Sequence, residues 1–246
     1  MNYLAASYGN ADRIDEAISL LNEYVLINPE NTFVAMKFAA LQVWFSKDAE
    51  YLVTCERMLQ WAQESTNPND FERVAKLSNL SSISNDKLKE SALALARRAV
   101  ELGTEKKEIL PWYHMSLGMA EFRSGNYTKA DTALVTAAET ASDTNDEAND
   151  EANDEANDEA NDEANDDVQR DRIESISNFY RVMSLFQQGK PDEARTLFNQ
   201  AEVKMKPLPI DEKNPLANDA NHDDLIIWLA YKEAKALLAE TGTSDE

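Results

Sequence analysis

The sequence has few of the residues that build tight turns, disulfides and ligand sites. Its 246 residues include only 6 Gly and 7 Pro, which is little for a sheet-rich fold and enough for helices joined by short loops. Cys55 is the single cysteine and cannot form a disulfide within the chain, which favours a reducing, cytoplasmic compartment. The two histidines, His114 and His222, have no cluster of Cys or carboxylate residues at zinc-ligand spacing, so the sequence predicts no metal.

Basic residues are also scarce, with 24 Lys and Arg against 46 Asp and Glu and a net charge of −22. A nucleic-acid-binding protein neutralises phosphates with a basic face, and the bases here are scattered, so we expect no nucleic-acid partner. No apolar run reaches the roughly 20 residues that span a bilayer, and no signal-peptide pattern is visible, so we expect no membrane partner. Phosphate-binding loops and hydrolase motifs are missing from the sequence, which predicts no catalytic residues, no cofactor and no enzyme.

Most of the negative charge is concentrated in one tract. From Asn145 the sequence NDEA occurs five times in tandem, and residues 143–167 contain 13 acids and no base. In a helix with this period the same acids would repel one another one turn apart, and Ala is the only apolar side chain available for burial. We therefore predict a disordered acidic insertion over residues 143–167. A calcium site is the alternative, but the tract lacks the Gly turn and the mixed ligand spacing of the known loop.

The rest of the chain repeats a pair of helices with a period of about 34 residues. Residues 112–139 have the pattern of two helices separated by a break at Gly125, and residues 178–205 repeat the pattern with a break at Gly189. Residues at equivalent positions of the second helices are Ala17, Leu21 and Tyr24; Tyr51, Cys55 and Met58; Ala92, Ala96 and Ala99; Ala130, Leu134 and Ala137; and Ala194, Phe198 and Ala201. Small residues let two helices approach closely, and such hairpins bury their apolar faces by stacking on one another.

These patterns predict an all-α fold made of stacked helical hairpins. We expect a solenoid of about five hairpins over residues 1–206, of which the second and third are degenerate, then an extended connector over residues 207–222. A helix follows over residues 223–240, with Asn221 as its N-cap. Its apolar residues predict that it is packed on the rest of the chain. It either caps the last hairpin or folds back into the groove as an internal ligand.

The first helices of three hairpins carry a stripe of aromatic residues and methionines at offsets of three and four, which places the side chains on one helix face. The candidate groove residues are Phe33, Met36, Trp112, Met115, Met119, Phe122, Phe179, Met183 and Phe186. Methionine-rich surfaces adapt to varied apolar partners, so the stripe predicts an apolar concave groove for a protein or peptide ligand. The alternative is that these residues only pack against the neighbouring hairpin.

The repeat resembles the tetratricopeptide repeat. The matching positions are Leu117-Gly118, Ala130-x3-Leu134, Ala194-x3-Phe198 and the span from Ala17 to Pro29. The sequence departs from the pattern at His114 and Glu121, where the repeat prefers Trp and Tyr. The resemblance implies a helical solenoid that binds proteins. It does not extend to the basic clamp that some of these proteins use for a C-terminal carboxylate, because Met115 and Met119 occupy the positions of the clamp.

Two stretches resemble a narrower group. WYHMSLGMAEFRSGNY at residues 112–127 and NPLANDANHDDLIIWLAYKEAKALL at residues 214–238 are similar to the C-terminal tetratricopeptide regions of bacterial eukaryotic-like Ser/Thr protein kinases. The resemblance implies an interaction or regulatory segment and carries over no catalytic residue. Two hypotheses follow: a stand-alone, non-catalytic interaction scaffold, or a detached or mis-started C-terminal regulatory region of such a kinase. An in-frame kinase domain encoded upstream of Met1 would decide for the second.

Overall fold

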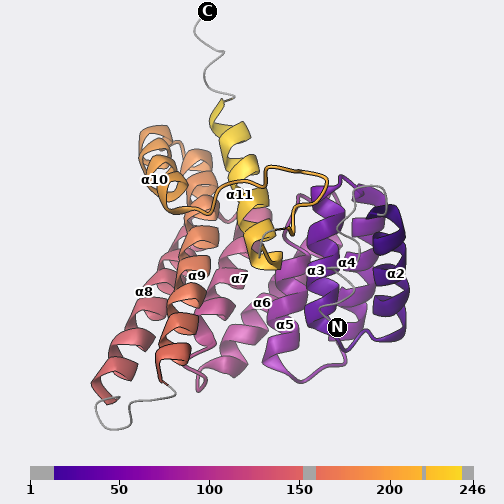
Figure 1. The fold of residues 1–246 in the computed structure, drawn as a ribbon, viewed down its shortest axis with the longest axis horizontal. Coiled ribbons are helices and arrows are strands. Elements are labelled where there is room, and N and C mark those ends of the chain that lie inside the picture. The colour runs from indigo at the N-terminus through magenta and orange to yellow at the C-terminus, as the bar shows by residue number, and fades with distance from the viewer. Residues whose placement is uncertain (1–13, 152–158, 218–219, 240–246) are drawn as a thin grey trace, which may run out of the picture.

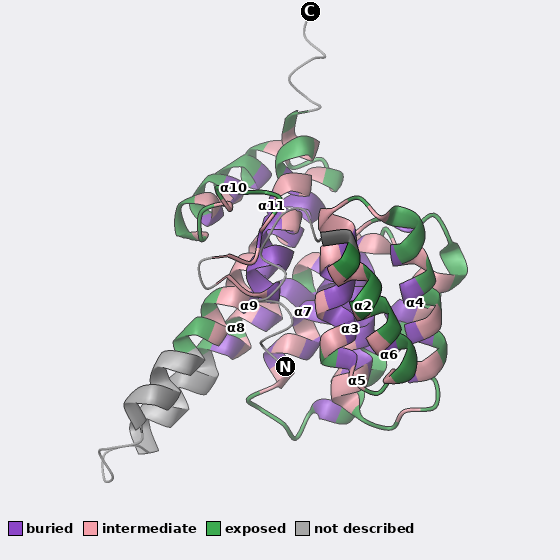
Figure 2. Ribbon diagram, turned by 45° about the vertical axis from the view of Figure 1, so that its right-hand side comes forward, coloured by how far each residue is buried: buried purple, intermediate pink, exposed green. Residues whose placement is uncertain are grey.

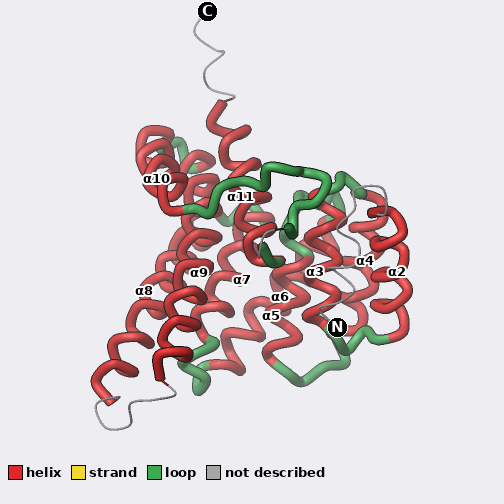
Figure 3. Tube along the Cα trace, viewed as in Figure 1, coloured by secondary structure: helices red, strands yellow, loops and turns green. Residues whose placement is uncertain are grey.

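The computed structural model of the protein describes residues 14–151, 159–217 and 220–239. Over these ranges the chain forms ten α-helices and no strand, which confirms the predicted all-α class (Figures 1 and 3). The helices are α2 (Ile14–Ile27), α3 (Thr32–Trp44), α4 (Asp48–Ala62), α5 (Pro68–Leu77), α6 (Asp86–Gly103), α7 (Leu110–Arg123), α8 (Tyr127–Glu151), α9 (Glu159–Gln187), α10 (Pro191–Lys204) and α11 (His222–Ala239). None of these described helices is both long and apolar enough to cross a membrane.

Successive helices pack as pairs, and alternate helices form a row. α3 packs on α4, α5 on α6, α7 on α8 and α9 on α10, while α3, α5, α7 and α9 contact one another in that order. Two of the tight connections depend on glycine: Gly125 after α7 has φ 77° and Gly189 after α9 has φ 75°. Both glycines lie at the predicted breaks, and Pro191 occupies the first turn of α10, where its missing N–H costs nothing.

The closest helix pair, α7 and α8, meets at a glycine. A Cβ atom built on Gly118 would lie 2.3 Å from Leu134 Cγ and 3.3 Å from the Ala130 carbonyl oxygen. Ala130, Leu134 and Ala137 of α8 are completely buried. The small residue at position 118 is therefore what allows the two helices to interlock, as the repeat spacing predicted.

The acidic tract differs from the prediction of disorder over residues 143–167. Helix α8 extends into the tract as far as Glu151, and α9 begins inside it at Glu159. Glu and Ala favour helix, and each end of the tract continues a helix that is already formed by packing, so no new helix has to be nucleated. Residues 152–158, and the first helix expected near Leu4 and Tyr8, lie outside the described residues.

The C-terminal helix is part of the hydrophobic core. Between α10 and α11, residues 205–217 and 220–221 form turns and irregular chain. Helix α11 packs on α9, α3 and α10. Because α5 and α7 separate α3 from α9 in the row, contact with both means that the row bends around α11 (Figure 1). Figure 2 shows buried residues on α3, α7, α9 and α11, and the apolar residues of all four belong to one cluster.

Candidate functional site

The candidate site is the side of the row that faces α11, which we call the inner face. It is defined by Phe33, Lys37 and Trp44 of α3, Lys76 of α5, Arg123 of α7, and Arg172 and Phe179 of α9. Helix α11 crosses this face with its first ten residues almost entirely buried. The inner face is therefore occupied by a helix in this structure. Its contacts with that helix lie at the start, in the middle and in the C-terminal half of α11.

The start of α11 is fixed by a reciprocal cap. The Asn221 side-chain oxygen accepts hydrogen bonds from the backbone N–H groups of Asp223 (2.8 Å) and Asp224 (3.2 Å). The Asp224 carboxylate in turn accepts from the Asn221 backbone N–H at 2.8 Å. This arrangement satisfies free backbone donors of the first turn. The two acids there also interact favourably with the positive end of the helix dipole. The N-cap predicted from the sequence is thus confirmed.

Aromatic rings fix the middle of α11. The Trp228 ring lies 6.0 Å from that of Trp44, and the Tyr231 ring lies 5.6 Å from Phe179 and 5.5 Å from Phe198. The two indole N–H groups also hold the connector, because Trp228 donates to the Lys206 carbonyl and Trp44 to the Glu212 carbonyl, each at 2.9 Å. The pairs combine a large apolar contact with specific orientation.

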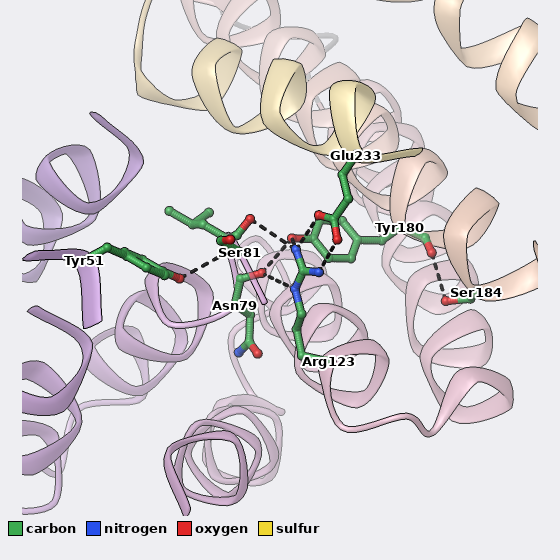
Figure 4. A network of polar contacts seen from close by, with 8 residues as sticks. Tyr51, Asn79, Ser81, Arg123, Tyr180, Ser184 and Glu233 are labelled. Carbon is green, nitrogen blue, oxygen red and sulfur yellow. Dashed lines mark hydrogen bonds and ion pairs between the residues drawn. The ribbon is translucent and has the colours of Figure 1, made fainter. Parts of the chain in front are cut away.

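A buried arginine binds the C-terminal half of α11 (Figure 4). Arg123, with a side chain only 5% exposed, donates to both carboxylate oxygens of Glu233, with Nη2 2.6 Å from Oε2. Its other donors reach the carbonyls of Asn79 (3.0 Å) and Leu80 (3.2 Å) and the Tyr180 hydroxyl (3.3 Å). One side chain therefore connects α7, the turn after α5, α9 and α11.

The protonation states in this network are defined by its surroundings. Burial on its own lowers the pKa of Arg123, but Tyr180 and Glu233 outweigh it, so the net pKa is raised. Burial also raises the pKa of Tyr180 to about 12, against the opposing effect of Arg123. At neutral pH the network is a guanidinium paired with a carboxylate and a neutral phenol, which donates 2.7 Å to the Asn79 carbonyl.

A second cluster of charges surrounds the first turn of α11. Asp223, 5% exposed, lies 3.8 Å from Arg172, and Asp224 lies 3.1 Å from Lys206. His222 is buried, with Nε2 3.3 Å from Asp223 and its ring edge-on to Phe33 at 4.8 Å. Within the described part of the chain its Nδ1 has no hydrogen-bond partner, and Oδ1 of Asp223 has only this contact with Nε2. Some polar groups are therefore buried at this end of α11 without full pairing, which is costly.

Burial, assisted by nearby cations, keeps His222 neutral. Burial is the largest cause that lowers the pKa of His222 to about 4, and the positive charges of Lys76, Lys37 and Arg172 lower it further, while Asp223 opposes them. Burial likewise lowers the pKa of Lys37. Three inner helices thus bring a cation to the same end of α11, and the imidazole there stays uncharged at neutral pH.

The predicted groove residues divide into three sets. Phe33 and Phe179 do contact α11, at His222 and Tyr231. The four methionines are at most 2% exposed and belong to the same apolar cluster as α11, namely Met36, Met115, Met119 and Met183. Of the rest, Phe122 is buried beside Tyr180, and Trp112 and Phe186 are half-buried. In this conformation the four methionines lie in the core and do not line an open groove.

The sequence analysis missed the polar part of the site. Arg123 directly follows the predicted stripe residue Phe122, but its partner Glu233 is 110 residues away, and no periodicity connects the two. Lys37, Lys76 and Arg172 likewise come from three separate helices. The one signal in the sequence was that these basic residues all lie on the helices of the row. It was hard to recognise because Lys and Arg are scattered along the whole chain.

Other reactive groups are placed unfavourably for chemistry. Burial raises the pKa of the Cys55 thiol to about 12, so it is protonated at neutral pH and a poor nucleophile. His114 is half-buried, and burial lowers its pKa. Within the described part of the chain no three His, Cys, Asp or Glu side chains converge as metal ligands.

No model of a protein family matches the chain, and neither does a curated protein or a solved structure. The tetratricopeptide and kinase resemblances therefore stay predictions.

Proposed function

We propose that the chain is a non-catalytic protein-interaction scaffold of the helical-repeat type, whose inner face accepts a helix from a partner protein. The observation that carries this proposal is α11 itself, a helix held across α3, α7 and α9 by aromatic contacts and a buried ion pair. A face that binds one helix in this way has the shape and the chemistry to bind another.

The residue types on the inner face support the proposal. Trp, Tyr and Arg are the side chains that most often dominate the free energy of protein–protein binding, above all where they are desolvated. Trp44 and Arg123 provide an indole and a buried guanidinium to α11, and Phe179 provides an apolar ring. These are anchor positions for a helix laid across the row.

In this proposal α11 acts as an internal competitor of the partner. A segment tethered by a connector of this kind has an effective concentration of roughly millimolar. A partner helix therefore binds only where it outcompetes α11 or where α11 has been released, and binding shifts the chain from a closed to an open population. The scaffold is then regulated by whatever loosens α11.

Site-specific photo-crosslinking tests the proposal. A photoreactive amino acid at Phe33, which is 40% exposed on the inner face, should capture a discrete protein in the native cell. The matched control is the same amino acid at Val53, 58% exposed on α4, which does not pack on α11. We expect a product at Phe33 that increases when Glu233→Gln loosens α11, and none at Val53. Equal products at both positions, or a product only at Val53, would contradict an inner-face interface.

A further inference from the structure

We propose that the partner helix shares the charge pattern of α11: an acidic first turn and, about ten residues later, a carboxylate for Arg123, with an aromatic residue between them. This inference rests on the proposed function and specifies the class of partner, an acidic helix with an aromatic anchor. In α11 the pattern consists of Asp223, Trp228 and Glu233.

The first support is the distribution of cations on the inner face. Each helix of the row contributes a cation: Lys37 from α3, Lys76 from α5, Arg123 from α7 and Arg172 from α9. Three of them act on the first turn of α11, and Arg123 binds the carboxylate ten residues later. Ten residues of helix span about 15 Å. The inner face thus contacts a bound helix through charges at two places, the first turn and the Arg123 site, with an apolar segment between them.

The second support is the cost of a mismatched ligand. Arg123 is 5% exposed and stays charged, so a purely apolar helix would leave a guanidinium buried without a counter-ion. A basic helix would place like charges against Lys37 and Arg172, whereas Lys76 is already paired with Glu72 at 2.8 Å. The chain as a whole has a net charge of −22, so the cations gathered on the inner face are a local exception. The face therefore discriminates in favour of acidic helices.

The third support is the incomplete pairing of α11. Among the described residues, His222 Nδ1 has no hydrogen-bond partner and Asp223 Oδ1 has only the 3.3 Å contact with His222 Nε2, so the polar groups at this end of α11 are incompletely paired. The connector between α10 and α11 is irregular, which allows α11 to leave while the helices of the row stay packed. A partner helix that carries hydrogen-bonding groups matched to this end of the face could displace it.

Peptide binding to the full chain tests the inference. The probe is a labelled synthetic peptide with the sequence of residues 221–239, and the control peptide is the same with Asp223→Asn and Glu233→Gln. The receptor is the full chain with Glu233→Gln, which loosens its own α11. We expect this receptor to bind the acidic peptide about 10-fold more tightly than the control peptide, and about 10-fold more tightly than the wild-type chain binds it, by fluorescence anisotropy.

A second receptor keeps the test informative if Glu233→Gln disturbs folding. Tyr231→Ala removes the ring that contacts Phe179 and Phe198 and loosens α11 with Arg123 and Glu233 intact. The same preference for the acidic peptide is expected. Equal binding of both peptides by a helical receptor would overturn the inference. So would a receptor that dimerises by light scattering without peptide, since the occupant would then be α11 of a second copy. If a partner is crosslinked at Phe33 but the two peptides bind equally, the inner-face interface would stand and the acidic character of the partner would be rejected.

Discussion

The α7–α8 pair and the contact between α11 and the inner face hold helices together by different means. At the first, Gly118 lets Leu134 approach closely, and the α8 residues buried there, Ala130, Leu134 and Ala137, are small or apolar. At the second, apolar rings share the interface with the Arg123–Glu233 pair and with partly unpaired groups around His222. Apolar packing is almost insensitive to pH and salt, whereas buried ion pairs add specificity more than stability. We therefore expect the first contact to persist wherever the chain is folded and the second to open more easily.

The largest expected effect is on the permanent contact. Gly118→Leu should lower the free energy of unfolding by roughly 3 kcal/mol, because even a Cβ there would lie 2.3 Å from Leu134 Cγ. Thermal unfolding followed by circular dichroism measures it. The control is Gly125→Asn, since Asn tolerates a positive φ and nothing lies within 4 Å of a Cβ there. Two similar melting temperatures would mean that the α7–α8 crossing is not closely packed at Gly118.

The second effect concerns the contact that can open. Glu233→Gln should cost roughly 1–3 kcal/mol, less than a fully buried pair, because the Glu233 side chain is 37% exposed while Arg123 is buried. Lys232→Gln, next to it on α11, removes an exposed pair with Glu212 and should cost less than about 1 kcal/mol. Urea unfolding compares the two. Equal losses of unfolding free energy in the two variants would mean that the Arg123–Glu233 pair does not determine how α11 binds.

The third effect is a pH dependence confined to α11. His222 has a pKa of about 4 when docked, and released into water it returns to about 6.5. The released state then binds more protons between these values, so docking is fully stable above pH 6.5 and weakens as the pH falls toward 4. We expect a loss of about 1 kcal/mol between about pH 7 and pH 5.5. Tryptophan fluorescence as a function of pH measures the docking of α11. The wild type should show this pH dependence and His222→Gln should lose it.

The smallest effect is expected in the acidic tract. Deleting residues 145–166 should leave the melting temperature nearly unchanged, because the buried side chains described nearest to the tract are Ala141 in α8 and Ile173 in α9. Differential scanning calorimetry of the shortened and full chains provides the comparison. A fall of several degrees would mean that the tract is packed against the helices.

The two regions also differ in how far the sequence could predict them. The α7–α8 pair follows from local signals: Gly118, the break at Gly125, and Ala130 and Leu134 one turn apart. The break recurs at Gly189 and the small residue of the second helix at Ala194. The position of α11 depends on a contact between residues 110 positions apart, which no period encodes. The sequence therefore predicted the helices and their breaks. For α11 it left two placements open, as a cap on the last hairpin or as an internal ligand in the groove.

The same limit applies to the predicted groove. Residue type and helical spacing identified Met115 and Met119 as one face of a helix, but spacing does not reveal what covers that face. Both are fully buried in the cluster that α11 completes. The acidic tract shows the opposite case: unfavourable charge spacing predicted disorder, and continuation of two packed helices carried helix into both of its ends.

Hydrogen exchange tests most directly whether α11 opens separately from the rest of the fold. Mass spectrometry would compare the backbone amides of α11 with those of α7 in the wild type and in Glu233→Gln. We predict faster exchange in α11 and the connector of the variant, with α7 and α8 unchanged. Equal acceleration in every helix would show that α11 leaves only when the whole chain unfolds, and would contradict a separable inner-face contact.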